Sequence, residues 1–120
     1  MINDCISKVC NIPVDLNQGD KSAYALAEES DFRSAHQKIE IGDIKSYLQN
    51  HNTLIDKWQQ WSLNKRTTGY YLTLEKSYTV GKLNKDGKTV FKKDFTSTVD
   101  ACAEFIYLEV SQILQLENET

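Results

Sequence analysis

The sequence predicts a single α+β domain over residues 1–120, with N-terminal helices, a three-stranded antiparallel meander, and a long C-terminal helix packed on the sheet. The spacing of apolar residues supports this order, because it is helical up to about residue 64, alternating between residues 70 and 95, and helical again from residue 98. The length fits one domain of about 100 to 200 residues. Six Tyr, four Phe and two Trp, within a hydrophobic content of 40%, supply the side chains for one core.

The first 40 residues contain one short extended stretch and one short helix in this interpretation. Residues 9–14 are mostly apolar and include the only proline, Pro13, which suits an edge strand or an extended arm. Asp20 can cap a helix over residues 23–27, because an aspartate at that position accepts a hydrogen bond from the first helical turn. The carboxylates that follow this helix are expected to face solvent.

Two more helices are predicted before residue 65. Gly42 and Asp43 open the first, and Thr53 with Asp56 resembles a capping box that starts the second. The apolar stripes of these helices are Ile44, Tyr47 and Leu48 in the first and Leu54, Ile55, Trp58 and Trp61 in the second.

The pattern changes to strands after Gly69. Tyr70, Leu72 and Leu74 alternate with residues that suit the opposite face of a strand. The segment 84–87 is typical of a tight hairpin turn, because Asp-Gly tolerates positive φ angles. The three strands are expected over residues 70–75, 78–83 and 89–95. Lysines at the turns and outward positions would discourage aggregation through the sheet edges.

The C-terminal helix is predicted from its cap and its apolar stripe. Ser97 and Asp100 form a capping box, and the helix is expected to run to about Leu116. Glu104 and Glu109 are expected to face away from the core. The predicted buried stripe is Val99, Cys102, Ala103, Ile106, Val110, Ile113 and Leu114.

Several classes of protein are disfavoured by the same sequence. The chain begins without a basic and apolar leader and has no apolar run near the roughly 20 residues of a membrane span, so we expect a cytoplasmic protein. Three cysteines in such a chain indicate reduced thiols, with Cys102 as a small buried hydrophobe. The spacing of cysteines and histidines predicts no metal site, and the five scattered glycines form no phosphate loop, so no cofactor is predicted.

Charge is distributed unevenly along the chain. Residues 1–64 carry six basic against nine acidic side chains, residues 65–93 eight against two, and residues 94–120 none against six. Solvated faces of opposite sign explain this distribution without any ligand, and a basic binding face would explain it as well. The pI of about 5.3 argues against general nucleic-acid binding and favours a basic protein partner.

Large aromatic and basic residues gather where the helical pattern gives way to the sheet. We expect Trp58 and Trp61 to be core residues that hold their helix on Tyr70 and Leu72. A nucleic-acid-binding module built on the basic segment 65–93 is the alternative. Its surface would comprise Lys65, Arg66, Tyr70, Tyr71, Lys76, Lys82 and Lys92. A third hypothesis is a small enzyme that uses His36 or His51 as a base.

The chain also resembles a known class of bacterial proteins. The residues that carry the resemblance, within about residues 43–113, are Trp58, Trp61-Ser62, Lys65-Arg66, Gly69-Tyr70-Tyr71, Val80-Gly81, Phe95 and Ala101-Cys102-Ala103-Glu104-Phe105-Ile106. This pattern is similar to small immunity proteins of contact-dependent growth inhibition and related polymorphic toxin systems. The resemblance implies a cytoplasmic protein, without catalytic residues, that binds the toxin domain of a cognate effector, often a nuclease, and blocks its active site or substrate surface.

We therefore expect a non-enzymatic inhibitor whose partner is a toxin domain. Nuclease domains are usually basic, so acidic side chains are the candidate contacts. They fall into an N-terminal set and a C-terminal helical set, between which the sequence does not choose. The candidate toxin-binding residues are Glu28, Glu29, Asp31, Glu40, Asp43, Glu104 and Glu109.

Overall fold

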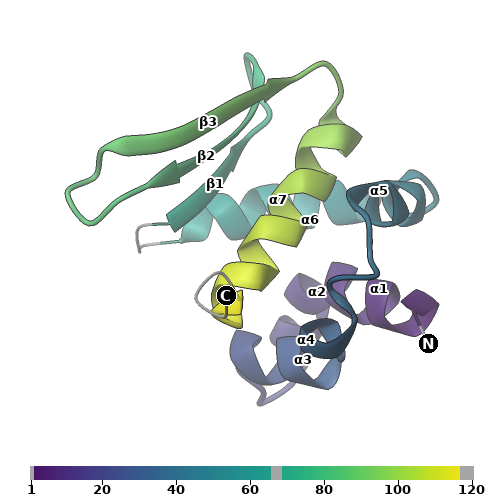
Figure 1. The fold of residues 1–120 in the computed structure, drawn as a ribbon. Helices are drawn as coiled ribbons and strands as arrows, with labels where there is room; N and C mark the ends of the chain where they lie inside the picture. Colours follow the sequence, from purple (N-terminus) through teal and green to yellow (C-terminus); the bar gives the residue numbers. More distant parts are fainter. Residues whose placement is uncertain (1, 66–68, 117–120) are drawn as a thin grey trace.

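The computed structural model describes residues 2–65 and 69–116, and within them it confirms the predicted α+β fold (Figure 1). The helices that precede the sheet are α1 (Ile2–Cys10), α2 (Ile12–Gln18), α3 (Ala23–Glu29), α4 (Phe32–Ala35), α5 (Ile41–Gln49) and α6 (Thr53–Asn64). The sheet comprises β1 (Gly69–Thr73), β2 (Tyr78–Leu83) and β3 (Thr89–Phe95), and α7 (Thr98–Ile113) follows it.

The sheet is the predicted antiparallel meander, in the order β1-β2-β3. Leu72 pairs with Val80, and Val80 pairs with Lys93, so these three side chains share the face that α7 covers. The predicted turn joins β2 to β3, where the Gly87 N–H donates to the Asn84 carbonyl at 2.9 Å and Gly87 has a φ of +77°. The alternating pattern and the Asp-Gly turn of this segment are local features of the sequence, which explains why β2 and β3 have the predicted bounds.

Helix α7 is the centre of the molecule, between the sheet and the N-terminal helices (Figure 1). Ser97 caps the helix as predicted, because its hydroxyl accepts from the Asp100 N–H at 3.1 Å. The Asp100 carboxylate accepts from the Ser97 hydroxyl at 3.0 Å, which is not the reciprocal bond to the Ser97 N–H that a capping box has. The predicted stripe was too narrow, since Ala101 and Phe105 are also fully buried. Glu109 is buried as well, so the expectation that it faces away from the core is wrong. A helix covered on two sides buries more than one stripe.

The N-terminal third differs from the sequence interpretation. Residues 9–14 are helical rather than extended, because Pro13 is the second residue of α2, where the missing N–H leaves no helical hydrogen bond unmade. Ser22 rather than Asp20 caps α3, and its hydroxyl accepts from the Ala25 N–H at 3.1 Å. Helix α6 starts at Thr53 as predicted but without the expected capping box.

Long-range hydrogen bonds attach the N-terminal helices to the rest of the fold. The Trp58 indole N–H on α6 donates to the Cys10 carbonyl at the end of α1, at 2.9 Å. The Tyr107 hydroxyl on α7 donates to the His36 carbonyl at 3.0 Å. Arg33 on α4 donates through Nη2 to the Leu114 carbonyl at 3.0 Å. The position of α1 and α4 is therefore fixed by α6 and α7.

The three thiols lie inside this core. Cys5, Cys10 and Cys102 are buried and free, and Cys102 occupies the apolar environment that was predicted for it. Burial raises the pKa of Cys10 from 9.0 to about 12, and it also raises the pKa of Cys5 and of Cys102. None of the helices in the described ranges has the length and apolar content needed to cross a bilayer.

The buried thiols predict a loss of stability in alkali. Their pKa is higher in the folded chain than in the unfolded chain, so their contribution is complete below about pH 9 and is lost as pH rises toward the folded value. We expect the free energy of unfolding in urea to fall progressively from about pH 9 toward pH 12. In the double variant Cys10→Ala, Cys102→Ala the fall should be shallower. An equally steep fall in both proteins would contradict this explanation.

Candidate functional site

A buried carboxylate joins α6, α7 and β1. The side chain of Glu109 is 3% exposed, and its Oε2 accepts from the Trp61 indole N–H at 2.7 Å. Its Oε1 accepts from the Lys65 ammonium at 2.9 Å, and Lys65 also donates to the Tyr70 carbonyl at 2.9 Å. Glu109 is thus enclosed by its own partners and cannot meet another protein, which removes it from the candidate contacts.

Helix α6 also covers the outer edge of β1. Gln59 donates to the Leu72 carbonyl at 2.9 Å, and the Ser62 hydroxyl accepts from the Leu72 N–H at 2.8 Å. These bonds satisfy edge groups that would otherwise be open to another strand. Trp58 is fully buried and Trp61 half-buried, as predicted for core residues. Their indole N–H groups donate to Cys10 and Glu109, and their packing on Tyr70 and Leu72 stays a prediction.

The alternative basic and aromatic residues do not form one surface. Lys65 is held by Glu109, and Tyr70 is only 8% exposed. The Lys82 ammonium lies 5.0 Å from the centre of the Tyr70 ring. These residues lie on the side of β1 that faces the core.

Two other members of that set lie on the opposite face of the sheet. Tyr71 pairs with Gly81, and Gly81 pairs with Lys92, so Tyr71 and Lys92 flank the glycine across the three strands. The Tyr71 ring lies so close to Gly81 that a Cβ there has no room. Lys76 is exposed in the connection between β1 and β2. Arg66 lies outside the described residues.

The acidic candidates on α7 and α5 are partly engaged. Glu104 lies 3.4 Å from the Lys93 ammonium, so its charge is directed toward the sheet. Glu40 and Asp43 form the capping box of α5, in which Asp43 Oδ2 accepts from the Glu40 N–H at 2.9 Å. Both α5 carboxylates remain exposed.

The remaining candidates cluster around α3. Glu28 pairs with Arg33 at 2.8 Å, and Glu29 pairs with Lys21 at 2.7 Å. Asp31 is exposed in the turn between α3 and α4, with a φ of 68°. Of the expected contacts, this group and the two α5 carboxylates are therefore the accessible ones.

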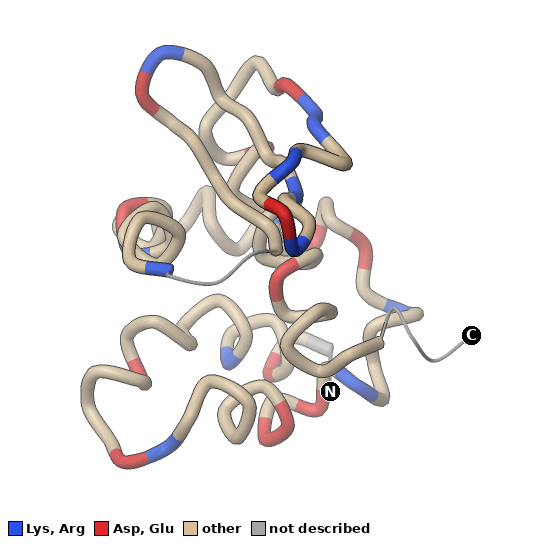
Figure 2. The backbone as a smooth tube through the Cα atoms, turned by 90° about the vertical axis from the view of Figure 1, so that its left-hand side faces the viewer, with Lys and Arg blue, Asp and Glu red and all other residues tan. Residues whose placement is uncertain are grey.

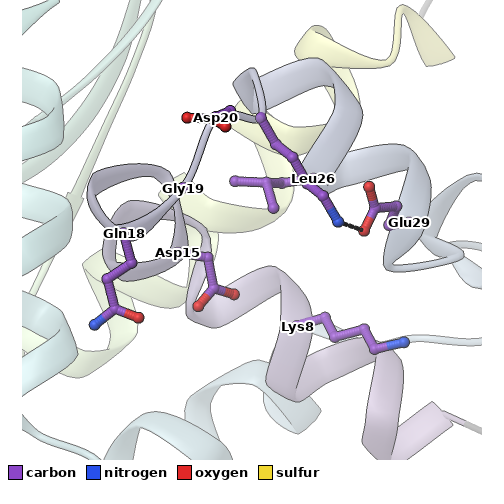
Figure 3. A pocket seen from close by; sticks show the side chains of 8 residues that line it. Lys8, Asp15, Gln18, Gly19, Asp20, Leu26 and Glu29 are labelled. Atoms are coloured by element: carbon purple, nitrogen blue, oxygen red, sulfur yellow. Dashed lines mark hydrogen bonds and ion pairs between the residues drawn. The ribbon is translucent and has the colours of Figure 1, made fainter.

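A cavity of about 330 Å³ opens beside this group (Figure 3). It lies among α1, α2 and α3 and is lined by Lys8, Asp15, Gln18, Gly19, Asp20, Lys21, Leu26 and Glu29. Sequence reasoning proposed only Glu29 of these as a contact and took Asp20 for a helix cap. The residues come from three helices and from the connection between α2 and α3, and no spacing along the chain indicates that they converge.

The fold turns the uneven charge of the sequence into separate regions (Figure 2). Residues 2–36, which form α1 to α4, carry six carboxylates against three cations. Residues 69–95, which form the sheet, carry six lysines against three carboxylates. The N-terminal helices, called here the acidic layer, therefore differ in sign from the sheet.

The two histidines lie in separate environments. His36 Nδ1 is 2.8 Å from the Arg33 carbonyl, and His51 Nδ1 is 2.9 Å from the Tyr47 carbonyl. The His51 ring also stacks on Tyr47, with 4.0 Å between centroids. Within residues 2–65 and 69–116, no three His, Cys, Asp or Glu side chains group in a way that could hold a metal ion.

None of the protein-family models, curated proteins or solved structures compared with the chain gives a match.

Two glutamates of α7, Glu109 and Glu104, should contribute very differently to the free energy of unfolding. Glu109→Gln leaves the Lys65 ammonium without its carboxylate, so the free energy of unfolding should fall by about 3 kcal/mol. Glu104→Gln removes the more exposed pair with Lys93 and should change it by less than about 1 kcal/mol. Urea titration of both variants measures the difference. Equal effects would contradict the structural role of Glu109, and adding Lys65→Met to Glu109→Gln should restore part of the stability.

Proposed function

We propose that the chain is an immunity protein that binds a bacterial toxin domain with nuclease activity and covers its active site or substrate surface. The acidic layer is the observation that carries the proposal, because its six carboxylates face only three cations of its own. Nuclease domains must attract phosphates and are usually basic, so a partner of opposite charge gains steering and discrimination. The chain would act by occupancy, without catalysis of its own.

The acidic layer is a better contact surface than the carboxylates of α7. Glu109 is buried, and the Glu104 side chain is only 15% exposed beside Lys93. Glu28 and Glu29 form ion pairs too, but their side chains remain 38% and 51% exposed, and Asp31 is exposed as well. Tyr24 on α3 is 51% exposed, and tyrosine is enriched at protein interfaces because it combines apolar area with a polar end. In the proposed role the protein works in the cytoplasm, where it meets the toxin.

The lysine-rich sheet favours a second candidate function, the binding of a nucleic acid. Val90 and Phe91 on β3 are exposed among the lysines, which would supply apolar contact beside phosphate-binding charge. The separation of Tyr70 and Tyr71 onto opposite faces of the sheet argues against a shared stacking platform. We therefore rank this function second.

The decisive experiment pairs the chain with the toxin domain encoded immediately upstream of its gene. Bacteria that express this domain should survive when they also express the chain, and the two proteins should copurify. No rescue and no complex would overturn the proposal. If the chain instead bound generic DNA or RNA with a steep dependence on salt, the second candidate would replace it.

Charge variants then test which surface meets the toxin. The triple variant Glu28→Gln, Glu29→Gln, Asp31→Asn should slow association about tenfold at low ionic strength, because it removes three charges from the acidic layer. The matched variant Lys85→Gln, Lys88→Gln, Lys92→Gln removes three charges from the sheet and should not slow it. Stopped-flow measurement of the association rate of both variants distinguishes the two surfaces. A larger loss in the lysine variant would place the contact on the sheet.

A further inference from the structure

The cavity among α1, α2 and α3 lies within the acidic layer and has a mixed lining. The Asp15 carboxylate extends from α2 into the space that faces α3, and Leu26 supplies an apolar wall (Figure 3). Glu29 and Lys21 form their ion pair at the side of this space. A hollow with a carboxylate, an apolar wall and open access fits a long side chain that is apolar along its length and charged at its end.

The charge of the cavity favours a cation. Lys21 is neutralised by Glu29 at 2.7 Å. In the part of the chain that the structure describes, neither Asp15 nor Asp20 has an ion-pair partner. Figure 3 shows the Lys8 ammonium turned away from the Asp15 carboxylate. The net effect is a negative site that its own lysines do not neutralise.

We propose that this cavity receives an arginine side chain of the basic partner, an inference that rests on the proposed function. The guanidinium would bind Asp15, with Asp20 at the rim, and its methylene groups would pack on Leu26. Arginine suits the site better than lysine because its planar fork donates two hydrogen bonds to one carboxylate. Arginine and tyrosine dominate binding energy at interfaces, and the exposed Tyr24 lies on the same helix as Leu26.

A peptide probe tests the cavity without the toxin. Acetyl-Ala-Arg-Ala-amide, added to the ¹⁵N-labelled protein, should shift the amide signals of Gly19 and Leu26 with a dissociation constant on the order of 1 mM. The peptide with Gln in place of Arg should give at least tenfold weaker binding. Asp15→Asn should abolish the difference between the peptides, whereas Asp86→Asn, which removes one charge from the β2–β3 turn, should preserve it. Equal shifts with both peptides, or shifts only elsewhere, would overturn the proposal.

A steric variant tests the same site without changing its charge. Gly19 has an extended backbone, with a φ of −145°, and a Cβ there would meet no atom closer than 3.8 Å. Gly19→Leu can therefore fold and extend its side chain into the cavity. It should block the arginine peptide, whereas Gly19→Ala, which leaves the cavity open, should bind as the wild type does.

The same variants in the toxin complex separate this inference from the proposed function. If the inference holds, Gly19→Leu and Asp15→Asn each weaken the complex at least tenfold, and Gly19→Ala and Asp86→Asn do not. If the wild-type complex forms and all four variants bind equally, the cavity proposal fails while the immunity function stands. If the arginine peptide binds at the cavity but no toxin complex forms, the site stands as a cation-binding cavity and the immunity function fails.

Discussion

The arrangement of the molecule depends on one buried carboxylate. Glu109 lies inside the core, and a charge in that position is stable only when opposite charge and hydrogen-bond donors surround it. Trp61 and Lys65 supply these donors from α6, and Lys65 extends the connection to the backbone of β1. This requirement holds α6 against both α7 and the edge of the sheet. Through Trp58, α6 also holds the end of α1, and with it the acidic layer.

In the proposed function, the fold separates the elements that support the core from those that would meet the partner. The sheet and α7 provide most of the long-range packing, and α7 is covered on two sides. Helices α1 to α4 are only four to nine residues long and lie over α6 and α7. Short helices expose many ends and turns, which is where binding side chains can be placed without disturbing a core. The cavity and the exposed carboxylates occur in this part of the molecule.

Sequence patterns predicted the elements that are specified locally. Alternation and the 84–87 turn gave the bounds of β2 and β3, and the hydroxyl of Ser97 marked the start of α7. The same reasoning failed where contacts with residues distant in the sequence decide the secondary structure of a segment. Pro13 indicated an extended segment, but it is the second residue of α2, a helix of seven residues that is too short to show a clear apolar stripe.

The site was less predictable than the fold for the same reason. Glu109 has the spacing of an outward residue, and its burial is explained by its partners at the end of α6, Trp61 and Lys65, the latter 44 residues earlier. The set of exposed carboxylates around α3 was predicted, since charge runs are visible in a sequence. The cavity was not predicted, because Lys8, Asp15 and Leu26 meet only when α1, α2 and α3 pack together.

Amide hydrogen exchange of the chain, with and without the toxin domain, shows whether the acidic layer is the contact surface and the sheet its support. If it is, exchange slows in α2, α3 and the segment between them when the complex forms, and stays unchanged in β2 and β3. Protection concentrated on β2 and β3, with none in α2 and α3, would contradict this placement of the contact surface.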